Sequence, residues 1–373
     1  MKYIRLTILL LLFFSHHSNL RAQESLVNEN QKTVLITGAA GFIGSNFLKY
    51  MFDKYPTYHF IVIDALTYAG SLEKLPDYIQ ESPRFEFIHD TITNEKAVDF
   101  AMARSHFVVH FAAETHVTRS IQNDAIFFYT DVIGTRVLMN AVVKYAKNIE
   151  RFIHISTSEV YGTAEYIPMD ENHPLNARSP YAAAKVGADR LVYSYCCTFN
   201  VPAVILRPFN NYGPGQHLEK LIPRFITSAI KSEPLTIHGS GQQKRDWIHT
   251  SDMARAIDAA LHLENFESIK HQVINIGSGT ATSIMEIAKI VLQQFDLPTS
   301  QLQFVSDRPG QVDIHLSSTE KAKALLNWNA TIALEEGIHQ TIEWYKNHPE
   351  IWQKMEKDAL VPITTAEGEI ILH

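Results

Sequence analysis

The sequence contains only two cysteines, Cys196 and Cys197, and they are adjacent. They form neither a disulfide framework nor a metal site, so the chain is typical of a reducing compartment. Positive charge is also scarce, since 33 Lys and Arg face 40 Asp and Glu for a net charge of −7. This excludes nucleic-acid binding by bulk charge. With 46% apolar and 20% charged residues, the composition argues against a disordered, fibrous, coiled-coil or multi-span membrane protein.

The chain has no apolar run long enough to span a bilayer, so we expect no integral membrane span. The run at residues 6–14 follows Lys2 and Arg5, and a cleavage site would follow Ala22. This pattern is typical of a secretory signal peptide, and the alternative is a disordered leader from an upstream start codon. We therefore treat residues 1–30 as a leader that is either signal-like or disordered.

From residue 32 onward, short apolar and β-branched runs alternate with stretches of helical periodicity. Such alternation predicts βαβ units and an α/β fold with a doubly wound Rossmann parallel sheet. Beyond about Tyr212, proline and glycine become commoner, which indicates a smaller C-terminal lobe interleaved with the sheet domain. The expected strands are residues 33–37, 60–64, 85–89, 107–111, 152–156 and 203–207, and the expected helices include 42–52, 134–145 and 181–198.

A glycine-rich turn follows the first expected strand and opens the first expected helix. Gly38, Gly41 and Gly44 have the spacing that lets a backbone turn tightly and approach a pyrophosphate at a helix N-terminus. Asp64 ends the second strand 20 residues after Gly44, where an acid would bind the ribose hydroxyls and repel a 2′-phosphate. The pattern therefore predicts an NAD site and favours NAD over NADP.

Tyr181 and Lys185 are four residues apart in an expected helix, so they share one face. An ammonium beside the phenol would lower the pKa of the tyrosine from about 10 and let it act as a base near neutral pH. Together with the upstream nucleotide turn, this pair indicates a dehydrogenase-type catalytic site.

Long motifs run through most of the chain, from about residue 33 to 356. They resemble the extended short-chain dehydrogenase/reductases and, among these, the nucleotide-sugar 4,6-dehydratases, most closely the dTDP-glucose 4,6-dehydratases. The motifs are DALTYAGSLEKL (64–75), HFAAETHVTRSI (110–121), STSEVYGTAEY (156–166), SPYAAAK (179–185), RPFNNYGPGQHLEKLIP (207–223), GSGQQKRDW (239–247), NIGSG (275–279) and DRPGQ (307–311).

The resemblance implies binding roles for residues at matching positions. The glycine turn and the following residues would line the NAD site: Gly38, Gly41, Phe42, Ile43, Gly44, Asp64, Leu66, Thr67, Asp90, Thr91, Ala112, Ala113, Thr130, Tyr181, Lys185 and Asn211. A nucleoside diphosphate sugar would be held by Thr115, Thr157, Asn210, Lys220, Leu221, Arg245, Asn275 and Arg308. Basic residues suit the diphosphate because charge-assisted hydrogen bonds to phosphate are strong. No metal is implied.

The resemblance also implies a mechanism. Tyr181, assisted by Thr157, would take the proton of the C4 hydroxyl while hydride passes to NAD. Glu159 would then remove the C5 proton, water would leave from C6, and the hydride would return to C6. The product would be an NDP-4-keto-6-deoxy sugar, and NAD would be recycled as an internal cofactor.

The catalytic triplet departs from the dTDP-glucose pattern of Thr-Asp-Glu, since this chain has Thr157, Ser158 and Glu159. A serine hydroxyl is too weak an acid to replace a carboxylic acid directly. Thr-Ser-Glu also occurs in GDP-mannose and UDP- or GDP-GlcNAc 4,6-dehydratases, where the glutamate is thought to serve both steps. The expected catalytic set is therefore Thr157, Ser158, Glu159, Tyr181 and Lys185.

Other departures concern the surroundings of the site. Thr118 stands where an aspartate is common, and Asp131 replaces a common asparagine. Residues 311–315 lack the arginines that the family places near the phosphates. The base and the hexose of the substrate therefore stay open.

Three alternatives to a dehydratase remain. UDP-glucuronate decarboxylases share the triplet and the C4 oxidation, but they usually carry a different segment before the lysine than SPYAAAK. NDP-sugar C4 epimerases need no base for C5, so Glu159 argues against them. A non-catalytic protein that binds NAD or a nucleotide sugar would not need the complete catalytic set.

By analogy with the family we expect a homodimer, formed through helices near residues 124–145 and 181–198. The expected organisation is a leader (1–30), an NAD-binding Rossmann domain (31–211), a mainly nucleotide-sugar-binding lobe (212–356) and a tail (357–373). Because NAD and activated sugars are cytoplasmic pools, we expect a cytoplasmic protein. The signal-like leader leaves export or tethering as the alternative, and a mature start near Gln23 would favour it.

Overall fold

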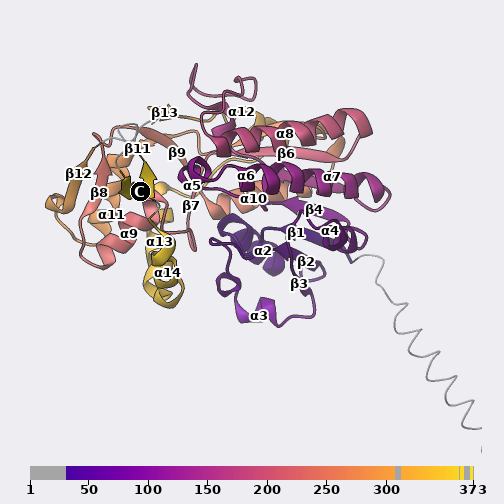
Figure 1. Cartoon of the computed structure of the whole chain (residues 1–373), viewed down its shortest axis with the longest axis horizontal. Coiled ribbons are helices and arrows are strands. Elements are labelled where there is room, and N and C mark those ends of the chain that lie inside the picture. The colour runs from indigo at the N-terminus through magenta and orange to yellow at the C-terminus, as the bar shows by residue number, and fades with distance from the viewer. Residues whose placement is uncertain (1–30, 307–311, 361, 365–369, 373) are drawn as a thin grey trace, which may run out of the picture.

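The computed structural model describes residues 31–306, 312–360, 362–364 and 370–372 (Figure 1). The predicted leader lies outside the described residues. A seven-stranded sheet forms the larger part of the molecule, with strand order β10-β6-β5-β4-β1-β2-β3. All neighbouring strands run parallel. The strands are β1 (Thr33–Thr37), β2 (His59–Asp64), β3 (Phe85–His89), β4 (Phe107–His110), β5 (Arg151–Ile155), β6 (Ala203–Pro208) and β10 (Val273–Ile276).

Helices cover both faces of this sheet, which confirms the doubly wound Rossmann fold. On one face, α2 (Phe42–Lys54) packs against α10 (Thr250–Leu261), and α12 (Glu320–Leu326) packs against β10. The other face carries α4 (Glu95–Met102), α7 (Thr135–Lys144) and α8 (Pro180–Phe199). The central strands are apolar on both sides because both of their faces are buried.

The helix α8 illustrates how local sequence sets the boundaries. Its N-cap Ser179 accepts a hydrogen bond from the backbone N–H of Ala182, and Pro180 occupies the first turn, where its missing N–H costs nothing. At the other end, Asn200 adopts a left-handed conformation that terminates the helix. The tyrosine and lysine predicted to be catalytic therefore lie in the first two turns, next to the sheet.

A smaller lobe follows β6 in the chain. Strand β9 (Lys244–His249) pairs with β7 (Asn210–Tyr212), β11 (Ala281–Ser283) and β13 (Ile314–His315), while β8 (Leu235–His238) pairs with β12 (Leu302–Val305). Helices α9 (Leu221–Ile230), α11 (Ile284–Gln294), α13 (Leu334–Asn347) and α14 (Pro349–Met355) enclose a separate apolar core. In the predicted tail, β14 (Pro362–Thr364) pairs with β15 (Ile370–Leu372).

The lobe and the sheet domain share chain segments. Although β10 and α10 come after residue 212, β10 forms an edge of the large sheet and α10 packs against α2. Spatially, therefore, the two parts interleave, and the division at residue 211 stays a prediction about sequence rather than a spatial border. The sequence did not predict β10, because its four residues carry too short a pattern.

Among the described residues, one helical segment is long and apolar enough to cross a membrane, at 125–144. Half of its most apolar window is buried inside the protein, as in the core helix of a globular protein. It comprises α6 (Ala125–Phe127), the π-helical turn η2 (Phe128–Gly134) and α7. By length and composition alone this is weak evidence for a span.

Candidate active site

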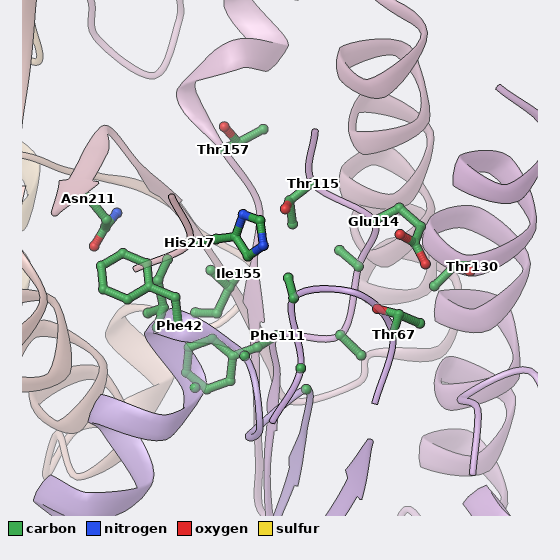
Figure 2. A pocket seen from close by; sticks show the side chains of 18 of the residues that line it. Phe42, Thr67, Phe111, Glu114, Thr115, Thr130, Ile155, Thr157, Asn211 and His217 are labelled. Atoms are coloured by element: carbon green, nitrogen blue, oxygen red, sulfur yellow. The ribbon is translucent and has the colours of Figure 1, made fainter. Parts of the chain in front are cut away.

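A cleft of about 410 Å³ opens at the carboxyl ends of the sheet strands, bordered by residues of the lobe (Figure 2). This is the edge at which open α/β sheets bind ligands. Most of the residues predicted from sequence line it, and they come from segments far apart in the chain. The structure brings together Gly38, Gly41, Phe42, Ile43, Gly44, Asp64, Thr67, Asp90, Thr91, Ala112, Ala113, Thr115, Thr130, Thr157, Glu159, Tyr181, Lys185, Asn210, Asn211, Lys220 and Leu221.

The glycine turn has no room for side chains. Gly38 has a φ of +76°, and a Cβ atom there would lie 2.6 Å from the backbone nitrogen of Ala112. A Cβ atom on Gly44 would lie 2.4 Å from the carbonyl oxygen of Gly38. No side chain caps the N-terminus of α2, whose N-cap is Gly41. Its free N–H groups therefore form a site suited to phosphate oxygens.

Asp64 lies at the end of β2 and holds the loops around it. Its Oδ2 accepts a hydrogen bond from the backbone N–H of Ala40, and its Oδ1 accepts one from Leu66, both at 2.9 Å. Burial raises the pKa of Asp64, and these two hydrogen bonds oppose that rise. The carboxylate thus orders the glycine turn while it lines the cleft, a role that the sequence pattern did not reveal.

Tyr181 and Lys185 face the cleft from α8. The Lys185 ammonium donates a hydrogen bond to the carbonyl oxygen of Ile155 at 2.9 Å, which fixes it at the end of β5. Burial lowers the pKa of Lys185 and raises that of Tyr181. A hydrogen bond from Thr157 opposes the rise, whereas the negative charges of Asp131 and Glu159 add to it.

The expectation of a tyrosine pKa lowered by Lys185 is therefore wrong. The net shift of the Tyr181 pKa is upward because the phenol is buried and two carboxylates lie near it. Burial raises the pKa because it disfavours the charged phenolate. The residue pattern of the sequence did not show that this face of the helix is buried against a π-helical turn. A lower pKa requires a positive charge brought by a ligand or the removal of a negative one.

Glu159 lies in the short turn η3 (Ser158–Tyr161) after β5. The backbone N–H of Glu159 donates to the Thr157 hydroxyl oxygen at 3.2 Å, so Thr157 both caps the turn and contacts the phenol. Glu159 lines the cleft, whereas Ser158 is 3% exposed and does not. Of the predicted triplet, Thr157 and Glu159 therefore face the ligand space.

Four predicted site residues do not line this cleft, namely Leu66, Ser158, Arg245 and Asn275, although the charge of Glu159 acts on the Arg245 guanidinium. The Asn275 amide is fully buried, where it accepts a hydrogen bond from the Tyr161 hydroxyl at 2.6 Å and donates one to Met169 at 3.0 Å. The Arg245 guanidinium donates to the carbonyl oxygen of Lys244 at 2.8 Å. Arg308 lies outside the described residues. A ligand role for these residues stays a prediction.

Other cleft residues were missed. Burial lowers the pKa of Lys74 to about 8, against the opposing charges of Asp64 and Glu219. Glu219 accepts a hydrogen bond from the Tyr68 hydroxyl at 3.0 Å, and its Oε2 lies 3.5 Å from Nδ1 of His217. These residues fall inside the motifs at 64–75 and 207–223, so their position within these motifs could have indicated that they line the site. Also missed were Glu114, Val117, Gln216 and Trp247.

Four polar atoms of the cleft residues are buried and lack a hydrogen-bond partner within the described part of the chain. They are Oδ1 of Asn211, Oε1 of Gln216, Nε2 of His217 and Oε2 of Glu219. Buried polar atoms are normally paired, so these atoms are suited to a polar ligand. No group of three or more His, Cys, Asp or Glu residues capable of holding a metal occurs among the residues described.

The sheet, the glycine turn and the Tyr181–Lys185 pair define an extended short-chain dehydrogenase/reductase. The family profile described as GDP-mannose 4,6 dehydratase matches residues 35–341. Because this covers most of the chain, the protein belongs to the nucleotide-sugar 4,6-dehydratase family.

Individual similar proteins support this family assignment. The chain is 36% identical to the dTDP-glucose 4,6-dehydratase of an Actinoplanes species, over 86% of this chain and 99% of the relative. It is 40% identical to the low-salt glycan biosynthesis protein Agl12 of Haloferax volcanii, over 84% of this chain and 98% of that protein. A crystal structure of dTDP-glucose 4,6-dehydratase from Bacillus anthracis in complex with NAD matches with a TM-score of 0.79 and 34% identity, covering 87% and 100% of the two chains.

Proposed function

We propose that this protein is an NAD-dependent nucleotide-sugar 4,6-dehydratase, a hydro-lyase that forms an NDP-4-keto-6-deoxy sugar. One observation carries the proposal: Glu159 lines the same cleft as the Tyr181–Lys185 pair. Oxidation at C4 requires only the pair, whereas elimination across C5 and C6 also requires a base. A carboxylate beside the pair provides that base.

The cleft residues fit NAD. The glycine turn leaves a cradle that a Cβ atom would fill, the uncapped N-terminus of α2 offers N–H groups to a pyrophosphate, and Asp64 lies where the ribose hydroxyls would bind. Related dTDP-glucose 4,6-dehydratases have been crystallised with NAD. When bound, NAD supplies the hydride acceptor for C4 and the hydride donor for C6.

The first proton transfer belongs to Tyr181. Its phenolate takes the proton of the C4 hydroxyl, and the Thr157 hydroxyl stabilises the phenolate by donating a hydrogen bond. Lys185, fixed on the carbonyl oxygen of Ile155, supplies a positive charge on the same helix face. The resulting 4-ketone makes the C5 hydrogen acidic.

Elimination then belongs to Glu159. Its carboxylate takes the C5 proton, and the same carboxyl group returns this proton to the C6 hydroxyl as water leaves. This dual role removes the need for a separate acid at Ser158, whose buried hydroxyl does not line the cleft. The proton that leaves C5 and the hydroxyl that leaves C6 together make one water molecule. When hydride returns to C6, C5 takes up one proton, which replaces the proton that Tyr181 removed from the C4 hydroxyl, so the whole reaction balances.

A nucleoside diphosphate suits the cationic residues at the lobe side of the cleft. Lys220 lines this side, and Lys74 lies at the same cleft with a pKa of about 8. The relatives include dehydratases named for dTDP-glucose, UDP-glucose and GDP-mannose, so the family alone does not select a base. We propose dTDP-glucose as the first substrate to test, since dehydratases named for it are 34–36% identical to this chain.

A panel of nucleotide sugars tests the function. The purified enzyme is incubated separately with dTDP-glucose, UDP-GlcNAc, GDP-mannose and UDP-glucuronate, and each product is weighed by mass spectrometry. Loss of one water from a hexose supports the dehydratase. Loss of carbon dioxide from UDP-glucuronate would identify a decarboxylase, and an isomer of unchanged mass would identify an epimerase. Binding of NAD without any turnover would identify a non-catalytic protein.

We also propose that the protein is a homodimer. Large apolar side chains are exposed on the face formed by α6, η2 and α8, among them Tyr129 at 58%, Ile126 at 45% and Tyr193 at 42%. The α8 helix packs against both η2 and α7, so these side chains lie on adjoining elements (Figure 1). Large apolar side chains exposed on adjoining elements are typical of an interface between subunits.

The dimer is tested by light scattering after size-exclusion chromatography. Tyr129→Glu is expected to give a monomer, because it places a charge at the centre of the interface. Phe304→Glu is the matched control, since Phe304 is 55% exposed on β12 of the lobe. A Tyr129→Glu variant that keeps the mass of a dimer would contradict this interface.

A cytoplasmic location completes the proposal. NAD and nucleotide sugars are cytoplasmic pools, and an exported enzyme would lack both. N-terminal sequencing of the native protein tests it. A mature start near Gln23 would indicate export and would contradict the proposed location.

A further inference from the structure

A carboxyl group that the mechanism does not use lies in the turn that packs against the helix of the catalytic pair. Asp131 is 1% exposed and belongs to the π-helical turn η2. Its Oδ1 accepts a hydrogen bond from the backbone N–H of Glu114 at 2.8 Å. Its Oδ2 is buried and has no hydrogen-bond partner among the described residues. A buried oxygen of this kind is costly, so it calls for a functional explanation.

The turn that carries Asp131 packs tightly on the helix that carries the catalytic pair. A Cβ atom on Gly187 of α8 would lie 3.0 Å from Cγ2 of Val132, so glycine there permits the close approach. Val132 and Phe127 pack around Tyr181 on either side of Asp131 in sequence. The π-helical geometry inserts one extra residue per turn, which is frequent at functional sites.

Charged and titratable groups face Asp131 from each neighbouring element. Lys185 and Tyr181 face it from α8, and Glu114 faces it from the segment after β4. On the α7 side, the Thr135 hydroxyl donates to the backbone oxygen of Asp131 and contacts Nε2 of His110 at 3.0 Å. Lys185 is therefore the positively charged group whose charge the Asp131 carboxylate offsets.

The effects on ionisation are reciprocal. Burial raises the pKa of Asp131 to about 7, even though the charge of Lys185 and the Glu114 hydrogen bond oppose this. The carboxylate in turn raises the pKa of Tyr181 and of Lys185. An asparagine at this position would keep the hydrogen bond to Glu114 but would carry no charge.

We propose that Asp131 is a positioning residue whose buried carboxylate offsets the charge of the Lys185 ammonium and itself restrains the loss of the proton from Tyr181. When Asp131 gains a proton, its negative charge no longer opposes ionisation of the phenol, and the phenol becomes the stronger acid. The ionisation of Asp131 therefore sets the pH range in which Tyr181 works as a base. This inference rests on the proposed function, because it takes Tyr181 as that base.

The test measures the phenol directly in the holoenzyme with bound NAD. Tyrosinate absorbance is titrated in the wild type and in Asp131→Asn, and each curve is corrected with the matching Tyr181→Phe protein. We expect the Tyr181 midpoint to fall by about one to three pH units in Asp131→Asn, as expected when a neighbouring charge is removed. Equal midpoints in the two proteins would overturn the inference.

Two further variants separate charge from packing. Asp131→Ala removes the charge and the hydrogen bond to Glu114, so it should lower the midpoint as Asp131→Asn does. A lower midpoint in Asp131→Ala alone would indicate a purely structural role and would also overturn the inference. Glu114→Gln is the matched control, since Glu114 is a buried carboxyl nearby that does not act on the phenol directly. Its midpoint should stay at the wild-type value, and a fall equal to that of Asp131→Asn would contradict the specific role of Asp131.

The kinetic readout distinguishes this inference from the proposed function. With a nucleotide sugar that the enzyme converts, the acid limb of the pH profile for C4 oxidation should move to lower pH in Asp131→Asn by the same number of units. If no nucleotide sugar is converted, the proposed function fails, while the tyrosinate titration still decides whether Asp131 controls the phenol.

Discussion

Replacing Gly44 by alanine tests the phosphate-binding turn most sharply. The added Cβ atom would lie 2.4 Å from the carbonyl oxygen of Gly38 and 2.8 Å from Cα of Ala39, where ordinary contacts begin at 3.4 Å. Both neighbours are backbone atoms, so they cannot rotate away. The turn and the N-terminus of α2 must therefore separate by about 1 Å, which is the difference between 3.4 and 2.4 Å.

Such overpacking costs ~1–3 kcal/mol. If the displacement falls on the N–H groups that bind the pyrophosphate, the Kd for NAD rises by about 5-fold to 150-fold. Isothermal titration calorimetry on protein freed of NAD measures this change, and thermal unfolding reports how much of the cost falls on stability instead.

Gly41→Ala provides a graded control in the same turn. Its Cβ atom would approach only the Gly38 carbonyl oxygen, at 3.2 Å, so the neighbour needs to move by a few tenths of an ångström. We expect a smaller loss of NAD affinity than in Gly44→Ala. The reasoning would be refuted if Gly44→Ala bound NAD as tightly as the wild type with unchanged stability, or if the two variants lost affinity equally.

Three other predictions concern stability and the cleft. Asp189→Asn should lower the free energy of unfolding, measured by urea denaturation, by ~3–5 kcal/mol. The reason is that Arg207, which is 2% exposed, donates two hydrogen bonds of 2.9 Å to the Asp189 carboxylate and would lose that negative charge. A change below about 1 kcal/mol would contradict this. Burial lowers the pKa of His154 to about 3. When the pH falls below about 6.5, His154 therefore takes up a proton in the unfolded chain but stays neutral in the folded chain. The wild type should therefore lose stability between pH 6.5 and 4, and His154→Phe should show a shallower loss; equal slopes would argue against a buried neutral His154. Lys74→Gln should weaken nucleotide-sugar binding more at pH 7 than at pH 9, because the Lys74 side chain, with a pKa of about 8, is mostly charged only at the lower pH. Calorimetry measures the affinity at both pH values. An equal loss of affinity at pH 7 and pH 9 would show that the charge of Lys74 plays no part.

Much of the fold could be predicted because the buried strands have short, continuous apolar patterns. Six of the seven strands of the sheet were expected within a residue or two of their ends. The seventh, β10, was missed because four residues in a segment rich in glycine carry no distinctive periodicity. Its place beside β6 depends on long-range packing with α12, which no local pattern records.

The site was predictable where its residues adjoin strand ends. Asp64 ends β2, and Gly38 and Thr157 come just after β1 and β5, so their meeting at one edge of the sheet follows from parallel topology. Glu219 and His217 reach the cleft from the lobe, and only the folded chain brings them there. The upward shift of the Tyr181 pKa also depended on burial against η2, which the sequence did not reveal.

The measurement that tests the central claim most directly is the reaction of Glu159→Gln with a nucleotide sugar that the wild type dehydrates. The amide cannot accept the C5 proton, so the account predicts reduction of bound NAD, seen by its absorbance, without release of 4-keto-6-deoxy product. Loss of the base should slow product formation by about 10²–10⁴-fold. Release of that product by Glu159→Gln at the wild-type rate would contradict the account.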